Sequence, residues 1–277
     1  MKIGDYNQVG IVTLTETACF LNAGGDSDIY MPADEVPEGR VKGDRIQVFL
    51  YRKSKDEVCA TTIRPYAVMG DFAALEVTDS TSFGLFLDWG LPKDLFVPQR
   101  NLRAELQPGD IAIVKIVPDH EGLGVMGTCI FEDLFDDDLS LLYPNKKVEL
   151  LVYGISELGA RVIIDNRFKG LLYQNEIFEK LRIGDSHTGY IKKIREDGLI
   201  DAALQPQGFF AASKEARTVI LEALEDGDGF LPLHDKCSAE EINRQLCMSK
   251  KVFKKAIGGL YKEKKITIKA DGIRLLH

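Results

Sequence analysis

Basic side chains gather in two parts of the sequence, where their charge is suited to holding phosphate groups. Residues 244–277 contain ten basic residues against two acidic ones. Those that we single out in this segment are Lys250, Lys251, Lys254, Lys255, Lys265 and Lys269. The second group consists of Lys169, Lys192, Lys193 and Arg195. Because ammonium and guanidinium groups bind nucleic-acid phosphates, both groups indicate a nucleic-acid surface. Lysines are also common on surfaces that bind nothing, where they discourage strand edges from pairing.

The charge of the chain is unevenly distributed. The net charge is −8 over 277 residues, yet residues 70–130 carry nine acidic and only four basic residues, so the acidic half is N-terminal and the basic surface C-terminal. Only Arg244 and Arg274 are arginines in the basic C-terminal segment. Since bidentate reading of guanine favours arginine, we expect phosphate affinity more than base recognition there.

Catalytic and metal-binding chemistry is not indicated. The four histidines, at positions 120, 187, 234 and 277, have no metal-ligand spacing to one another or to cysteine. No phosphate-binding loop, nucleophile elbow or dinucleotide motif occurs. The run Asp136-Asp137-Asp138 lacks the glycine and the terminal glutamate of a calcium-binding loop. We therefore expect no enzyme, no cofactor and no metal site.

The cysteines and the apolar runs favour a cytoplasmic protein. The five cysteines are odd in number and never closer than ten residues, which predicts reduced thiols rather than a disulfide framework. No apolar run approaches the 18 residues expected of a membrane-spanning helix. The N-terminus also lacks an apolar segment like that of a secretory signal.

A threefold repeat must position these side chains. Small or turn-forming residues recur with gaps of 14, 14 and 11, and each series ends in Gly-Asp. The three series are Gly4, Ala18, Pro32, Gly43; Gly70, Gly84, Pro98, Gly109; and Asn145, Gly159, Tyr173, Gly184. Near-twofold alternation within each block, and turn signals every 8–14 residues, predict five strands per repeat. Each repeat then suits a small closed barrel of the OB type.

The strand pattern also assigns side chains to the two faces of the sheet. In the second repeat Leu85, Leu87 and Trp89 share one parity, so we place Trp89 inside the barrel. Phe86 has the opposite parity and lies on the other face of the strand, where it can stack on a base if that face is exposed to solvent. An aromatic in an alternating strand is nevertheless more often part of the core.

The blocks resemble the S1 RNA-binding domain. Its signature runs Gly-x-Phe-Val, then Gly-Leu-Val-His-Ile-Ser-Glu-Leu, then Gly-Asp and a basic hairpin. The third block, GARVIID…KGLLYQNEI, and the second, FGLFLDWG…KDLFVPQRNL…PGD, follow it, whereas the first, ACFLNAGG…DIYMPADEV…KGD, is the most divergent.

The resemblance implies an RNA-binding face at three positions of each barrel. These are Phe83, Phe86 and Pro98 in repeat two; Leu158, Arg161 and Tyr173 in repeat three; and Thr17, Phe20 and Pro32 in repeat one. Only repeat two keeps both aromatics, and no repeat keeps the histidine. Arg161 and Tyr173 can still stack on bases or pair with phosphate.

The pattern becomes helical near residue 209. It predicts a helix from Ser213 to near Gly227, a short strand at 230–233, a helix capped by Ser238, a third helix capped by Ser249, and a hairpin turning at Asp271-Gly272. This order describes a winged helix. Its third helix presents Lys250, Lys251, Lys254 and Lys255 opposite its apolar stripe, and the hairpin adds further cations.

The predicted organisation is multidomain and mainly β. It comprises three tandem OB-type five-stranded barrels at 1–64, 65–130 and 145–206, an acidic linker at 131–144, and an α+β winged-helix domain at 209–277. As a whole the chain resembles the conserved virulence factor B family of bacterial RNA-binding regulators. The resemblance implies a cytoplasmic protein that binds RNA and affects expression of other genes, including virulence genes.

The sequence is compatible with three functions. The first is a regulatory protein that binds single-stranded RNA mainly through the third barrel and the winged helix, and acts post-transcriptionally. The second is a protein-interaction scaffold associated with the transcription, ribosome or RNA-decay machinery. The third is a DNA-binding regulator that uses its winged helix.

Overall fold

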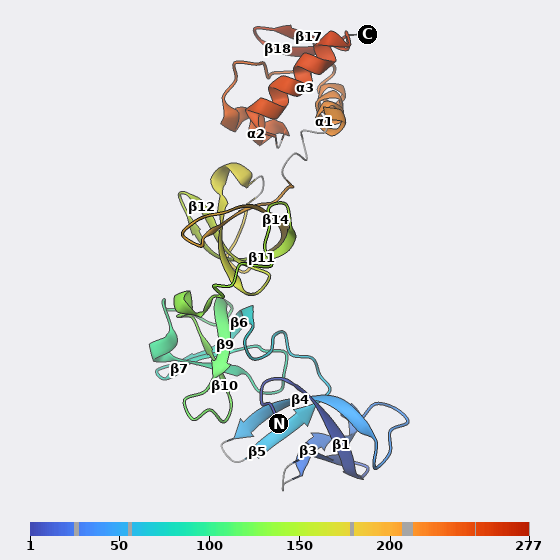
Figure 1. Cartoon of the computed structure of the whole chain (residues 1–277), viewed down its shortest axis with the longest axis vertical. Coiled ribbons are helices and arrows are strands. Elements are labelled where there is room, and N and C mark those ends of the chain that lie inside the picture. The colour runs from blue at the N-terminus through green and yellow to red at the C-terminus, as the bar shows by residue number, and fades with distance from the viewer. Residues whose placement is uncertain (25–27, 55–56, 178–179, 207–212, 247, 277) are drawn as a thin grey trace.

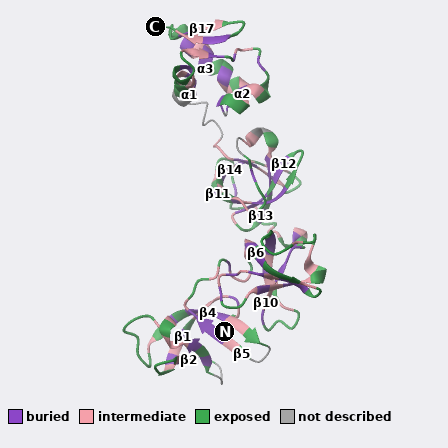
Figure 2. Ribbon diagram, turned by 180° about the vertical axis from the view of Figure 1, so that it is seen from behind, coloured by how far each residue is buried: buried purple, intermediate pink, exposed green. Residues whose placement is uncertain are grey.

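The computed structural model contains three β-barrels followed by a small α+β domain, in the order of the chain (Figure 1). It describes residues 1–24, 28–54, 57–177, 180–206, 213–246 and 248–276. The predicted fold class is therefore confirmed. Buried residues gather within each unit (Figure 2), and Phe49 of the first barrel belongs to the core cluster of the second.

The first barrel is closed, with strand order β1-β2-β3-β5-β4. Its strands are β1 Tyr6–Leu14, β2 Ala18–Asn22, β3 Ile29–Pro32, β4 Arg45–Ser54 and β5 Glu57–Thr61. A 3₁₀ turn, η1 Ala33–Glu35, follows β3. β3 pairs with β5 in parallel and the other neighbours are antiparallel, which gives the OB topology that the spacing predicts.

The second barrel is nearly closed. Its five strands form one sheet in the order β10-β9-β6-β7-β8, and no hydrogen-bonded ladder joins the two end strands in the described part of the chain. The strands are β6 Phe72–Thr81, β7 Gly84–Leu87, β8 Leu95–Pro98, β9 Ile111–Pro118 and β10 Val125–Thr128, with η2 Gln99–Asn101 after β8. The end strands β8 and β10 nevertheless lie side by side. Trp89 lies in the core at 3% exposure, as predicted.

The third barrel is closed like the first, in the order β11-β12-β13-β15-β14. Its strands are β11 Lys147–Ser156, β12 Gly159–Ile164, β13 Phe168–Tyr173, β14 Ser186–Ile194 and β15 Ile200–Ala203, and η4 Gln174–Glu176 follows β13. Each repeat thus has a short 3₁₀ turn between its third and fourth strands.

The repeated landmarks are cross-strand partners. Ala18 faces Pro32, Gly84 faces Pro98, and Gly159 faces Tyr173 across adjacent strands. At Gly84 the backbone φ is +150°, and an added Cβ would lie 2.1 Å from the carbonyl oxygen of Val97. Only glycine tolerates so close an approach of two backbones at this position.

The Gly-Asp pairs form the same turn three times. The aspartate carboxylate accepts a hydrogen bond from the backbone N–H three residues earlier, at 3.1 Å for Asp44, 2.8 Å for Asp110 and 2.7 Å for Asp185. The preceding glycine has a φ between +92° and +96° in each copy. A turn closed by the aspartate side chain, with a left-handed glycine before it, thus leads into the fourth strand of every barrel.

Apolar contacts join neighbouring barrels. Phe49 of the first barrel packs edge-on against Trp89 of the second, with ring centroids 5.4 Å apart. Between the second and third barrels, Phe72, Phe131, Phe135 and Tyr153 form one aromatic cluster. The acidic segment 131–144 therefore contributes aromatic packing as well as charge, and it includes a short 3₁₀ turn, η3 Glu132–Leu134. The boundaries of the four units stay predictions.

The C-terminal domain has the predicted order of helix, strand, two helices and hairpin. Its elements are α1 Ser213–Asp226, β16 Phe230–Leu231, α2 Ala239–Leu246, α3 Lys250–Lys262, β17 Ile266–Lys269 and β18 Gly272–Leu275. Ser249 caps α3 by accepting a hydrogen bond from the N–H of Val252 at 3.4 Å. Phe253 and Leu260 of α3 are fully buried in the core.

Four of the five cysteines lie in the described part of the chain. Cys19, Cys59, Cys129 and Cys237 are free and buried, and Cys247 lies outside the described residues. Across the part of the chain that the structure describes, no helix has the length and apolarity needed to cross a membrane.

Candidate nucleic-acid interface

The outer face of the third barrel brings several predicted residues together. Arg161 of β12 faces Leu171 of β13, and Leu171 in turn faces Asp201 of β15. Because directly opposed residues point to the same side of a sheet, these three form one outward row. Tyr173 stands two residues further along β13, so it shares that face.

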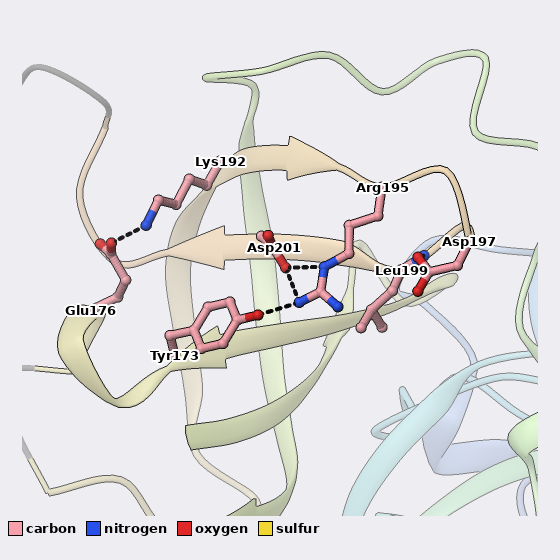
Figure 3. Close-up of polar contacts among 7 residues, drawn as sticks. All are labelled: Tyr173, Glu176, Lys192, Arg195, Asp197, Leu199 and Asp201. Atoms are coloured by element: carbon pink, nitrogen blue, oxygen red, sulfur yellow. Dashed lines mark hydrogen bonds and ion pairs between the residues drawn. The ribbon is translucent and has the colours of Figure 1, made fainter. Parts of the chain in front are cut away.

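Tyr173 and Arg195 are held together on this face (Figure 3). Arg195 Nη2 donates a hydrogen bond to the phenol oxygen of Tyr173 at 2.5 Å. The same guanidinium group donates through Nε to Asp201 Oδ1 at 2.8 Å. The hydrogen bond to Asp201 raises the pKa of Arg195 above its ordinary value. The cation is thus fixed in orientation and partly neutralised by its own barrel.

Lys192 is also engaged within the barrel. Its ammonium group forms an ion pair with Glu176 of η4 (Figure 3). Lys169 and Lys193 are exposed instead, with no ion pair to any described residue. Of the four lysines and arginines predicted from the charge of this barrel, two are therefore open to a phosphate and two have acidic partners.

Arg161 lies over an aromatic ring at the edge of the joint with barrel two. Its guanidinium carbon is 5.2 Å from the ring centroid of Tyr153, which is mostly buried. The burial of Tyr153 raises the pKa of its phenol. One face of the guanidinium group rests on the ring of Tyr153. Because Arg161 is exposed, its N–H groups remain available to a ligand.

The second barrel carries an aromatic pair on the equivalent face. Phe86 faces Phe96 across β7 and β8, with ring centroids 5.2 Å apart. Phe83, just before β7, is 79% exposed. The sequence prediction named Phe83 and Phe86 but missed Phe96, although Phe96 shares the parity of Pro98 on the same strand.

The first barrel repeats this pair. Phe20 faces Tyr30 across β2 and β3 with ring centroids 6.3 Å apart, and Tyr30 is 38% exposed. The prediction for this barrel named Thr17, Phe20 and Pro32 and missed Tyr30. The same outward cross-strand position thus holds Phe20 with Tyr30, Phe86 with Phe96, and Arg161 with Leu171.

The lysines of the winged helix lie opposite the buried side of α3. Lys251, Lys254 and Lys255 are exposed and Lys250 is half-buried, whereas Phe253, Ala256 and Ile257 are buried. None of these four lysines has an ion pair within the described residues. In the hairpin, Lys265 approaches Glu263 at 3.7 Å and Lys269 is exposed. This face of α3 is the densest group of unpaired cations that we predicted.

Two family models match parts of the chain. The S1 domain model matches residues 3–63, and the model of the CvfB-like winged helix domain matches residues 218–275. The S1 match falls on the first barrel, whose signature residues diverge most. Neither description names a catalytic activity. Among the described residues, no group of three or more His, Cys, Asp and Glu side chains could hold a metal ion.

Relatives are similar over most of the chain. The uncharacterized protein YitL of Bacillus subtilis is 28% identical over 96% of this chain and 91% of its own length. Conserved virulence factor B of Staphylococcus aureus is 28% identical over 84% of this chain and 80% of its own length. A solved multidomain protein with nucleic acid binding domains from Streptococcus pneumoniae shares 25% identity, covers 99% of this chain and 98% of its own, and has a TM-score of 0.48.

Proposed function

This chain is a CvfB-like protein that combines an S1 domain with a CvfB-like winged helix domain, and we propose that it binds single-stranded RNA and regulates gene expression post-transcriptionally. The third barrel and the winged helix supply most of the contacts. The regulatory part of the proposal follows the name of the Staphylococcus aureus relatives, which are called conserved virulence factors.

The observation that carries the proposal is the repeated outer face of the barrels. Phe86 of barrel two and Arg161 of barrel three occupy the same cross-strand position, and both point away from their cores. Aromatic rings and guanidinium planes stack on unpaired bases without requiring a particular sequence. A single strand that crosses such a face gains about 1–3 kcal/mol for each base that stacks.

Exposed lysines complement these stacking positions. Lys169 and Lys193 border the outer face of barrel three, and Lys251, Lys254 and Lys255 project from α3. Each phosphate that such a lysine neutralises releases bound counterions from the nucleic acid. The binding constant therefore falls steeply as salt is added, even though the net charge of the whole protein is −8.

A second candidate is binding of duplex DNA through the winged helix. The lysine face of α3 favours it, because an exposed basic helix of this domain type can enter a major groove. Because the segment contains few arginines, we expect the winged helix to contact the phosphate backbone of duplex DNA rather than to read its bases.

The test is a binding titration of the full chain with fluorescent single-stranded RNA and duplex DNA of equal length, followed by anisotropy at several salt concentrations. The proposal predicts tighter binding of the single-stranded RNA, with a salt slope of about −0.7 for each phosphate contacted. Preference for the duplex would favour the second candidate. Absence of RNA binding at about 50 mM salt, the low end of the usual comparison, would overturn the proposal.

A further inference from the structure

A pocket lies between the first and second barrels. Its volume is about 330 Å³, within the range of roughly 300–1,000 Å³ of small-molecule sites. The first barrel contributes Tyr51, Arg52 and Ser54 from the end of β4. The second contributes residues before and within β8, together with the hairpin between β9 and β10. The pocket therefore exists only where the two barrels meet.

Direct bonds between the barrels fix the walls. Arg52 Nε donates to the backbone oxygen of Leu123 at 2.9 Å, and Lys93 Nζ donates to the backbone oxygen of Arg52 at 2.7 Å. Trp89, which lines the pocket, donates its indole N–H to the backbone oxygen of Ala67 at 2.8 Å. Its ring also packs against Phe49. The pocket is thus preformed rather than a gap between independent domains.

Aromatic side chains give the pocket flat apolar surfaces. Tyr51, Trp89 and Phe96 line it. Phe96 is also half of the outward pair with Phe86 on the face of barrel two. A strand stacked on that pair would therefore have a neighbouring base beside the pocket.

The polar lining offers hydrogen-bond acceptors. Asp94 accepts a hydrogen bond from Thr78 at 2.7 Å through Oδ2, and Asp119 accepts one from the N–H of Leu123 at 2.9 Å through Oδ1. The second oxygen of each carboxylate has no hydrogen bond from a described residue. Because a carboxylate accepts from several donors, these oxygens favour a ligand with N–H groups.

We propose that this pocket binds an unstacked nucleobase that carries an exocyclic amino group, as adenine, cytosine and guanine do. The inference rests on the proposed RNA binding and extends it, because it assigns base preference to a site outside the outer faces of the barrels. An exocyclic amino group offers two N–H donors, one for each carboxylate, whereas uracil offers only its ring N3–H and leaves one carboxylate oxygen unpaired. The pocket therefore discriminates against uracil by about tenfold, the cost of losing one hydrogen bond to a charged group.

The single tryptophan makes occupancy measurable. Trp89 is the only tryptophan of the chain and lines the pocket, so its emission reports on this site alone when tyrosines are not excited. The full chain is titrated with AMP, CMP and UMP and, separately, with oligo(A), oligo(C) and oligo(U) RNA. Overall RNA binding is followed in parallel by anisotropy of a labelled strand.

The variant Asp94→Asn tests the acceptor, since an asparagine can still accept the hydrogen bond from Thr78. Asp133→Asn, an exposed change of equal charge outside the pocket, is the control. We expect adenine and cytosine ligands to change Trp89 emission, uracil ligands to do so about tenfold more weakly, and Asp94→Asn alone to remove that difference.

The outcomes separate this inference from the proposed function. RNA binding by anisotropy without a Trp89 response, or with equal responses to adenine and uracil, overturns the pocket and leaves the proposed function standing. A selective response to mononucleotides without binding of RNA strands supports the pocket and overturns the proposed function. No response and no binding overturn both.

Discussion

Arg195 donates a hydrogen bond of 2.5 Å to the phenol oxygen of Tyr173, while Asp201 holds the same guanidinium group from β15. A tyrosine ring and an arginine are thus fixed side by side on the outer face of the third barrel (Figure 3). The carboxylate that orients the cation also occupies donors that a phosphate would use, so we expect Asp201 to compete with RNA for Arg195.

Replacing Asp201 with asparagine should strengthen RNA binding. The change frees Arg195 and removes a negative charge from the face, so we expect a lower dissociation constant and a salt slope steeper by about 0.7 for one added phosphate contact. Anisotropy titrations at several salt concentrations measure both. Asp197→Asn on the adjacent hairpin is the control for charge alone. Equal effects of the two variants, or weaker binding by Asp201→Asn, would show that Asp201 does not compete.

Removing the predicted stacking residues of barrel three should weaken RNA binding. For the double variant Arg161→Ala with Tyr173→Ala we expect a loss of about tenfold, at the low end of the free energy of one or two stacked bases. The matched control is Arg40→Ala with Tyr143→Ala, which removes an exposed arginine and tyrosine elsewhere. Thermal unfolding by circular dichroism checks that both variants fold. Identical affinities of the two would remove barrel three from the binding site.

Lysines of α3 should contribute affinity without sequence preference. Lys254→Ala with Lys255→Ala should weaken binding to all single-stranded RNAs by a similar factor and reduce the salt slope by about 0.7 for each lost phosphate contact. Lys42→Ala with Lys236→Ala removes two exposed lysines outside α3 and serves as the control. A loss confined to one RNA sequence would point to base reading, contrary to the low arginine content of the domain.

Two glycines of the second barrel should differ in their tolerance of alanine. At Gly84 the new Cβ would meet the oxygen of Val97 at 2.1 Å, whereas at Gly109 nothing lies within 4 Å. Both have positive φ, so each substitution costs about 1–3 kcal/mol of backbone strain, but only Gly84→Ala adds a backbone collision. Urea unfolding should therefore show a clearly larger loss for Gly84→Ala. Equal losses would contradict the close approach of β7 and β8.

The fold could be predicted because its landmarks are local. Gly84 and Gly159 mark points where two backbones meet, and the aspartates after Gly43, Gly109 and Gly184 cap their own turns. Such requirements act within a few residues or across one hairpin, so they appear as fixed spacings. The parity of Trp89 likewise placed it inside the barrel without further information.

The site could be predicted only in part, since its electrostatics depend on contacts between distant strands. Lys192 pairs with Glu176 and Arg195 with Asp201 through the register of β13, β14 and β15, which includes a bulge between Ile191 and Lys193. No spacing rule in the sequence specifies that register. Strand parity is sufficient to place Phe96 and Tyr30 on the outer faces, although neither stands at an S1 signature position.

The aromatic contacts between neighbouring barrels could not be predicted either, because they too depend on tertiary structure. Phe131 and Phe135 stand in a segment whose aspartates dominate its composition, yet their rings pack with Phe72 and Tyr153 of the flanking barrels. Which barrel an aromatic side chain packs against is determined by the tertiary structure, so the local composition does not predict it. The pocket beside Trp89 was unpredictable on the same grounds.

RNA contact by barrel three and α3 can be tested by crosslinking the full chain to single-stranded RNA and mapping the crosslinked peptides. We expect these peptides to come from the outer face of barrel three, around Arg161 and Tyr173, and from α3 around Lys254, with yields that fall as salt is raised. Crosslinks that avoid both segments, or yields that do not exceed those of an unrelated acidic protein, would contradict it.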